Sequence, residues 1–193
     1  MDEPVAYQEW TWTRPHLPLG FCLTVARGLS PSALADRLGV TAEREILGWH
    51  EAVAEFGVDK PLARIGVVAD WAFAIQEYGA EAGQPDALRA AAVGTDAVTV
   101  WQTAKALSWF GHARDSEILV AFELASPHQR TGAAPDELVG PMTAVGLHPD
   151  RPWPVDAPVS PVFPGLTLLT AITGVRLTRA DLEGPLLTGE LVG

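Results

Sequence analysis

Acidic side chains beside β-prone runs are the first residues in this sequence that could do chemistry. Glu77, Glu117 and Glu123 lie on or next to such runs, and two facing carboxyl groups could act as general acid and base. Glu77 and Glu123 come near the ends of their apolar runs, so we take them as candidate site residues, with His112 as a third. The alternative interpretation is that these acids are solvated on a sheet face.

No motif for a metal, a nucleotide or a serine nucleophile is found. The five histidines are dispersed, and His50-Glu51 opens the H-E-x-x-H zinc motif but Ala54 occupies the place of the second histidine. The glycines fall singly, unlike a phosphate-binding loop, and no G-x-S-x-G elbow occurs. The lone Cys22 lies in an apolar run and has no disulfide partner. We therefore predict no metal, no cofactor and no catalytic residue from a known motif.

Tryptophan is unusually frequent, with seven in 193 residues. Trp71, Trp101 and Trp109 lie in expected strands, where alternate side chains face opposite sides of the sheet. If the three share an exposed face they form an aromatic recognition surface, because interfaces are rich in tryptophan. If they face inward they fill the core. The core interpretation is favoured, and all three are kept as candidate binding residues.

The charge of the chain limits its partners. A net charge of −11 with only 13 scattered basic residues opposes binding to nucleic acid or to anionic membranes, but it would favour association with a basic protein. No apolar run is long enough to span a membrane. The first residues are acidic, unlike a secretory signal, so we expect a cytoplasmic location.

Runs rich in β-forming residues predict five or six strands. They cover residues 21–26, 64–69, 71–78, 97–101, 107–113 and 117–124. The runs on either side of Asp70 predict a hairpin, and Arg114-Asp115-Ser116 predicts the turn between the last two strands. Three consecutive strands without helical crossovers favour an antiparallel sheet.

Short helices are predicted between and after these strands. They cover residues 31–38, 48–56, 85–93, 135–145 and 166–172, with a last short turn after 178. Ser30-Pro31 and Thr178 to Asp181 are typical of helix starts, and Gly39 is typical of a helix end. The predicted fold class is α+β: a single domain, residues 1–193, with a mainly antiparallel sheet and several short helices packed on it. Residues 1–20 are expected to be an irregular or short helical lead-in whose tryptophans pack onto the body. Residues 147–164, with six prolines, are expected to be an extended connector.

Several of these segments, taken together, resemble a family of uncharacterised small proteins of high-GC Gram-positive bacteria, a domain of unknown function. The resembling residues are 21–31, 70–77, 94–100, 106–110, 122–123 and 146–147. The resemblance covers about residues 10–190; it implies the architecture and brings no known activity. The family's second hairpin strand tends to end in Glu-Pro-Asn-Gly, whereas this chain has Gln76-Glu77-Tyr78-Gly79. A function carried by that loop would be altered or lost here.

Two classes of function stay open from the sequence. The favoured one is a non-catalytic interaction protein, immunity-like, accessory or regulatory, that presents a sheet face or edge to one partner, for example a basic protein. The alternative is an enzyme or small-ligand binder with an unfamiliar site between sheet and helices, for example in a specialised-metabolite or peptide-modification pathway. A deep pocket holding Glu77, Glu123 or His112 in mutual reach would favour the alternative. An exposed aromatic patch rimmed by acids would favour the first.

Overall fold

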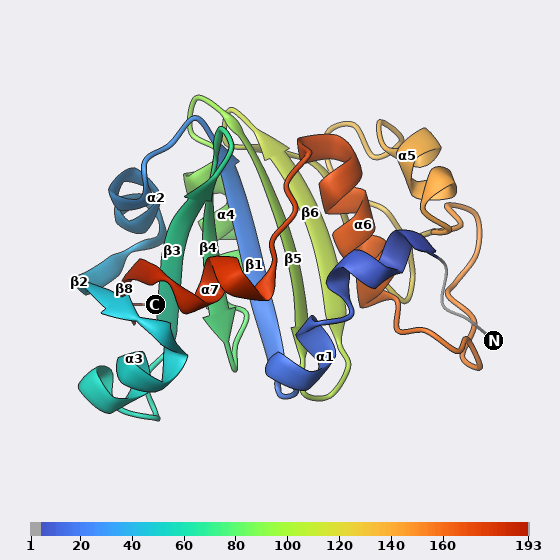
Figure 1. Cartoon of the computed structure of the whole chain (residues 1–193). Helices are drawn as coiled ribbons and strands as arrows, with labels where there is room; N and C mark the ends of the chain where they lie inside the picture. The colour runs from blue at the N-terminus through green and yellow to red at the C-terminus, as the bar shows by residue number, and fades with distance from the viewer. Residues whose placement is uncertain (1–4, 193) are drawn as a thin grey trace.

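The computed structural model describes residues 5–192. They form one sheet of eight strands in the order β2-β8-β3-β4-β1-β5-β6-β7, and every neighbouring pair is antiparallel (Figure 1). The strands are β1 (Gly20–Arg27), β2 (Val40–Leu47), β3 (Leu62–Val68), β4 (Trp71–Glu77), β5 (Asp96–Thr103), β6 (Ser108–Arg114), β7 (Glu117–Glu123) and β8 (Pro185–Leu191). The α+β class and the antiparallel sheet are confirmed, but the prediction of five or six strands is wrong.

Helices cover both faces of this sheet. They are η1 (Val5–Trp10), α1 (Thr13–His16), α2 (Pro31–Leu38), α3 (Gly48–Phe56), η2 (Glu81–Gly83), α4 (Pro85–Ala91), α5 (Val139–Ala144), α6 (Val162–Thr173) and α7 (Arg179–Glu183). Figure 1 shows α6, η1 and α1 in front of one face, with α2 and α4 behind the other. Because side chains alternate along each strand, they pack into two separate apolar cores, one on each face of the sheet.

The two strands that sequence patterning misses are β2 and β8. β2 lies at the sheet edge, and only Val40 and Ile46 among its side chains are buried, so it lacks the apolar alternation of a strand. β8 begins with a proline and contains Gly189, where a Cβ would lie 2.6 Å from the Thr41 carbonyl oxygen of β2. The close approach of the two backbones at the β2 bulge therefore requires glycine, a residue that is rare in strands.

The helix starts and ends predicted from the sequence agree with the structure at α2 and α7. Ser30 Oγ accepts from Ala33 N at 3.1 Å at the start of α2, and Gly39 ends that helix with φ at 70°. A capping box between Thr178 and Asp181 starts α7 as predicted. The predicted hairpin of residues 64–78 is formed by β3 and β4, and α3 has the predicted bounds.

The lead-in contains the short helices η1 and α1, one of the two alternatives expected for it. Tyr7 donates to Val145 O at 2.8 Å and Trp10 donates to Thr170 Oγ1 at 3.2 Å, which anchors the lead-in to the body. Two other boundaries differ from the prediction. α6 begins at Val162, inside the expected connector, and α5 is shorter than the predicted helix over 135–145. The connector is fastened at Trp153, which donates from its backbone to Ala125 O and from its ring to Val159 O.

Candidate functional site

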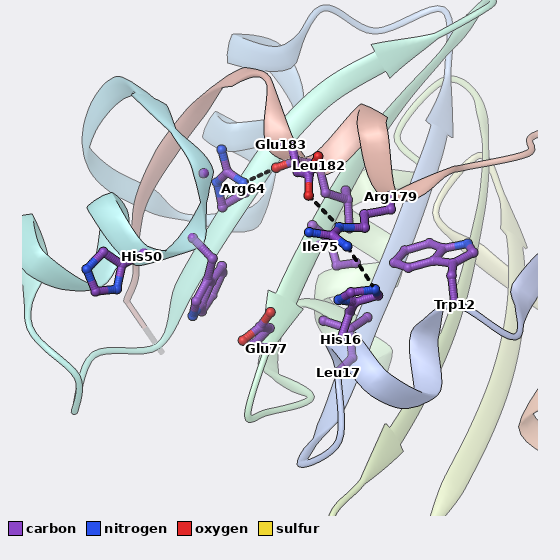
Figure 2. Close-up of a pocket in the computed structure, with 12 residues that line it drawn as sticks. Trp12, His16, Leu17, His50, Arg64, Ile75, Glu77, Arg179, Leu182 and Glu183 are labelled. Carbon is purple, nitrogen blue, oxygen red and sulfur yellow. Dashed lines mark hydrogen bonds and ion pairs between the residues drawn. The ribbon is translucent and has the colours of Figure 1, made fainter.

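A cavity of about 330 Å³ lies between one end of the β3–β4 hairpin and the short helices α1, α3 and α7. The sheet contributes Arg64, Ile75 and Glu77, and the first turn of α3 contributes Gly48, Trp49 and His50. The lead-in contributes Trp12, His16 and Leu17, and α7 contributes Arg179, Leu182 and Glu183. Figure 2 shows His50 on one side of this cavity and Trp12 and His16 on the other, with the sheet residues between them.

Arg64 is a buried cation in the wall of this cavity. It is 2% exposed, and its Nη2 donates to Ile46 O and Gly184 O, each at 3.0 Å, while Nη1 donates to Leu182 O. Its Nε has no hydrogen-bond partner, and no ion pair to it is found within residues 5–192. Burial lowers the pKa of Arg64, opposed by the nearby charge of Glu77. The guanidinium is thus held by carbonyl dipoles and lacks a full counter-charge.

Glu77 is the acid of the cavity. It ends β4, and Arg64 lies opposite Ile75 in the antiparallel register, so both charged side chains project from the same face of the sheet. Burial raises the pKa of Glu77 to about 7, although the charge of Arg64 acts in the opposite direction. A carboxyl group of this kind can hold or release a proton near neutral pH.

The first turn of α3 lines the same cavity through Gly48, Trp49 and His50. Leu47 precedes the helix and supplies no side-chain cap, although the Glu51 carboxylate accepts from Leu47 N at 3.2 Å. Gly48 has φ at 73°, a left-handed conformation that turns the chain sharply from β2 into the helix. The ring nitrogen of Trp49 is buried and has no acceptor. One residue on the α3 side of the cavity, Trp49, therefore carries an unpaired donor.

α7 and the lead-in form the remaining wall. Arg179 Nη1 lies 3.5 Å from His16 Nε2, and the Arg179 guanidinium also pairs with Glu183 one turn along α7 (Figure 2). Trp12 is fixed by its ring nitrogen, which donates to Leu177 O at 3.1 Å. Both Arg179 and His16 are exposed, so this wall borders solvent.

The three candidate tryptophans do not share a face. Trp71 is 6% exposed in the core of one face, while Trp101 and Trp109 stack on the opposite face with ring centroids 6.3 Å apart. Both stacked rings are half-buried, and the ring nitrogen of Trp101 is buried without an acceptor. None of the three lines the cavity.

The structure also separates the candidate polar residues. Glu123 lies on β7 and Glu77 on β4, with three strands between them, a span of roughly 19 Å at ordinary strand spacing. His112 is buried on β6, where its Nε2 lies 3.3 Å from Asp96 Oδ1 and its Nδ1 has no partner. Burial lowers the pKa of His112, and the hydrogen bond that its ring donates to the Asp96 carboxylate opposes this shift. The proposed pairing of Glu77 with Glu123 is therefore absent, and only Glu77 reaches the cavity.

Sequence reasoning missed most of the cavity. Arg64 appears in the sequence as one charge in an apolar strand, and nothing there indicates that the carbonyls of Leu182 and Gly184 will close over it. His50 stands in the sequence only at the start of an incomplete zinc motif. Within the described chain, no group of three or more histidine, cysteine, aspartate or glutamate side chains is placed to hold a metal ion. Over the same residues, no helix is long and apolar enough to cross a membrane.

The fold and the cavity define the class of protein: a single-sheet α+β protein with a charged, ligand-sized cavity at one end of its sheet. Over residues 4–186 the chain matches the model of the family of unknown function DUF6461, and it belongs to that family. The expected membership of an uncharacterised family is confirmed to this extent, and the bacterial group stays a prediction. No curated protein and no solved structure gives a significant match.

Proposed function

We propose that this protein binds a small molecule in the cavity between β3, β4, α1, α3 and α7. One observation carries the proposal: a buried guanidinium and a half-buried carboxyl group line the same cavity without pairing with each other. Removing charged groups from water is costly unless they are compensated. A ligand that supplies the missing partners would recover part of this cost.

The size and the walls of the cavity support the same proposal. About 330 Å³ is within the usual range of small-molecule sites, which are mostly apolar with a few placed polar groups. Trp12, Leu17, Ile75 and Leu182 supply the apolar surface here. Glu77, with its pKa near 7, would also be suited to transfer a proton to a bound molecule, so an enzyme is the chemical extension of this proposal.

A pair of Leu to Trp variants tests the proposal. Leu182 is half-buried in the cavity wall, so Leu182→Trp should fill the cavity; Leu107 is 55% exposed in the β5–β6 turn, so Leu107→Trp is the matched control. We expect compounds from a mixed library of acids, amines and neutral aromatics to bind wild type and Leu107→Trp equally in ligand-observed NMR. Binding to Leu182→Trp should fall at least about tenfold, the equivalent of 1.4 kcal/mol.

Two results would overturn the proposal. The first is that no compound in the library binds the wild-type protein. The second is that Leu182→Trp, shown by circular dichroism to be folded, binds the same compounds as tightly as the control does.

Partner binding is the second candidate function. The net charge of −11 and the half-buried Trp101–Trp109 pair favour association with a basic protein surface. Affinity capture from the native lysate, repeated with Trp109→Ala, tests it: a stoichiometric basic partner that is lost in the variant supports this role. Recovery of no stoichiometric partner argues against it.

A further inference from the structure

The buried guanidinium indicates what kind of ligand fits the cavity. Arg64 is 2% exposed, three backbone carbonyls take its Nη hydrogens, and its Nε–H remains without an acceptor. Carbonyl dipoles solvate a guanidinium but do not neutralise it, and an arginine in this position favours a carboxylate through charge-assisted hydrogen bonds.

The α3 side of the cavity has the same preference. The helix begins at Gly48, and its first turn lines the cavity, so the positive end of the helix dipole lies there. The Glu51 carboxylate accepts from Leu47 N, outside the helix, and does not cap the N–H groups of the first turn. The buried ring N–H of Trp49 also lacks an acceptor. Two residues that line the cavity, Arg64 and Trp49, thus carry buried donors without acceptors, beside a helix N-terminus. These features favour a ligand that accepts hydrogen bonds and carries negative charge.

We propose that the ligand is a small carboxylate with an apolar body, whose carboxylate is received by Arg64, Trp49 and the start of α3 and accepts a hydrogen bond from protonated Glu77. This inference rests on the proposed ligand-binding function. The apolar body would lie against Trp12, Leu17, Ile75 and Leu182. No bond is made or broken; one proton is taken up by Glu77 from solvent.

Glu77 makes this binding dependent on pH. The charged and titratable groups around it are Arg64 from β3, His16 from the lead-in, His50 from α3, and Arg179 and Glu183 from α7. Arg179 and Glu183 pair with each other, which leaves Arg64 as the main charge opposed to Glu77. A bound anion would compete for that charge and stabilise the protonated form of Glu77. Affinity should therefore fall as pH rises above about 7, the pKa of the free site.

A set of matched probes tests the charge of the ligand. Phenylacetate, phenylacetamide and phenethylamine share an aromatic body and differ in the polar group. Isothermal titration of wild-type protein at pH 6 should show binding of phenylacetate at about 1 mM or tighter, with the amide and the amine at least about tenfold weaker. Amine or amide binding equal to or tighter than that of phenylacetate overturns the carboxylate inference and leaves the ligand-binding function intact. If none of the three binds, the carboxylate inference fails; if the mixed library also yields no compound, the function fails with it.

A pH series with Glu77→Gln tests the proton. For wild type we expect the affinity for phenylacetate to fall by up to about tenfold per pH unit between pH 7 and 9, since one proton is taken up on binding. Glu77→Gln keeps a hydrogen-bond donor that does not titrate, so its affinity should stay nearly constant. Affinity that rises with pH in wild type, or a slope that persists in the variant, contradicts the role given to Glu77.

Arg64 is tested by a conservative change, because its contacts with Ile46 O and Gly184 O also support the fold. Arg64→Lys keeps the charge and loses the guanidinium fork. We expect it to bind phenylacetate at least about tenfold more weakly than wild type does, while Arg27→Lys, a change at an exposed ion pair with Asp70, leaves binding unchanged. Unchanged binding in folded Arg64→Lys would overturn the assignment.

Discussion

At the residue scale, Arg64 and Glu77 differ from the other charges of the molecule in their surroundings. Most ion pairs in the described residues lie at the surface, such as Arg27 with Asp70 at 3.0 Å, and contribute little to stability. Arg64 and Glu77 instead share a cavity without pairing. Burial lowers the pKa of Arg64 and raises that of Glu77, and both shifts favour the neutral form of the side chain. Their charged forms are therefore maintained at a cost to the folded state, which is a common feature of binding sites.

The raised pKa of Glu77 predicts how the stability of the folded protein varies with pH. The pKa of Glu77 is about 7 in the folded protein against 4.5 for a free side chain, so the folded state binds more protons between these values. Stability from this group is present below pH 4.5 and is lost as pH rises through 7. Glu77→Gln should remove this loss, gaining about 1–2 kcal/mol over wild type between pH 5 and pH 8, a range that allows for solvent screening of a half-buried group. Urea unfolding of both proteins at pH 5 and pH 8 measures this gain. The prediction is contradicted if the free energy of unfolding changes by the same amount in wild type and Glu77→Gln between the two pH values.

At the element scale, the sheet places unrelated segments side by side. The strands with clear apolar patterns, β1 and β3 to β7, could be predicted from the sequence because burial on both faces demands β-formers there. β2 and β8 could not, because an edge strand needs few apolar side chains and Gly189 is required by a close backbone approach. The same limit applies to the candidate site. Glu77 could be predicted as a site residue from its place at the end of an apolar strand. The contact of α7 with Arg64 could not, because the α7 carbonyls reach Arg64 only through the pairing of β8 with β3.

The Trp101–Trp109 stack depends on a glycine in β6. A Cβ at Gly111 would lie 2.5 Å from the Trp109 ring and 2.7 Å from Leu88 of α4. Gly111→Ala should destabilise the protein by about 1–3 kcal/mol through overpacking. Gly140→Ala is the matched control: nothing lies within 4 Å of its Cβ, and it lies in α5, so a gain of about 0.5–1 kcal/mol is expected there. Thermal unfolding of both variants measures these changes in stability. A Gly111→Ala variant as stable as wild type would show that the Trp109 ring is not packed as described.

At the scale of the whole molecule, the cavity lies where the lead-in and α7 meet one end of the β3–β4 hairpin. The lead-in and α7 are joined by the contact between His16 and Arg179, and Trp12 donates to Leu177 O. The site therefore exists only when the C-terminal segment has folded onto the sheet. This arrangement explains why no local motif marks it: its lining residues come from five separate stretches of sequence, each ordinary by itself.

The ring N–H signals of the tryptophans offer the most direct test of the central claim, that the cavity binds a small carboxylate. Trp49 and Trp101 both have buried ring N–H groups without acceptors, but only Trp49 lines the cavity, so Trp101 is an internal control. In ¹H–¹⁵N spectra assigned with Trp49→Phe and Trp101→Phe, addition of phenylacetate should move the Trp49 proton to higher frequency as it gains an acceptor, and should leave Trp101 in place. A Trp49 signal that stays fixed at saturating phenylacetate, or an equal shift at Trp101, would contradict the claim.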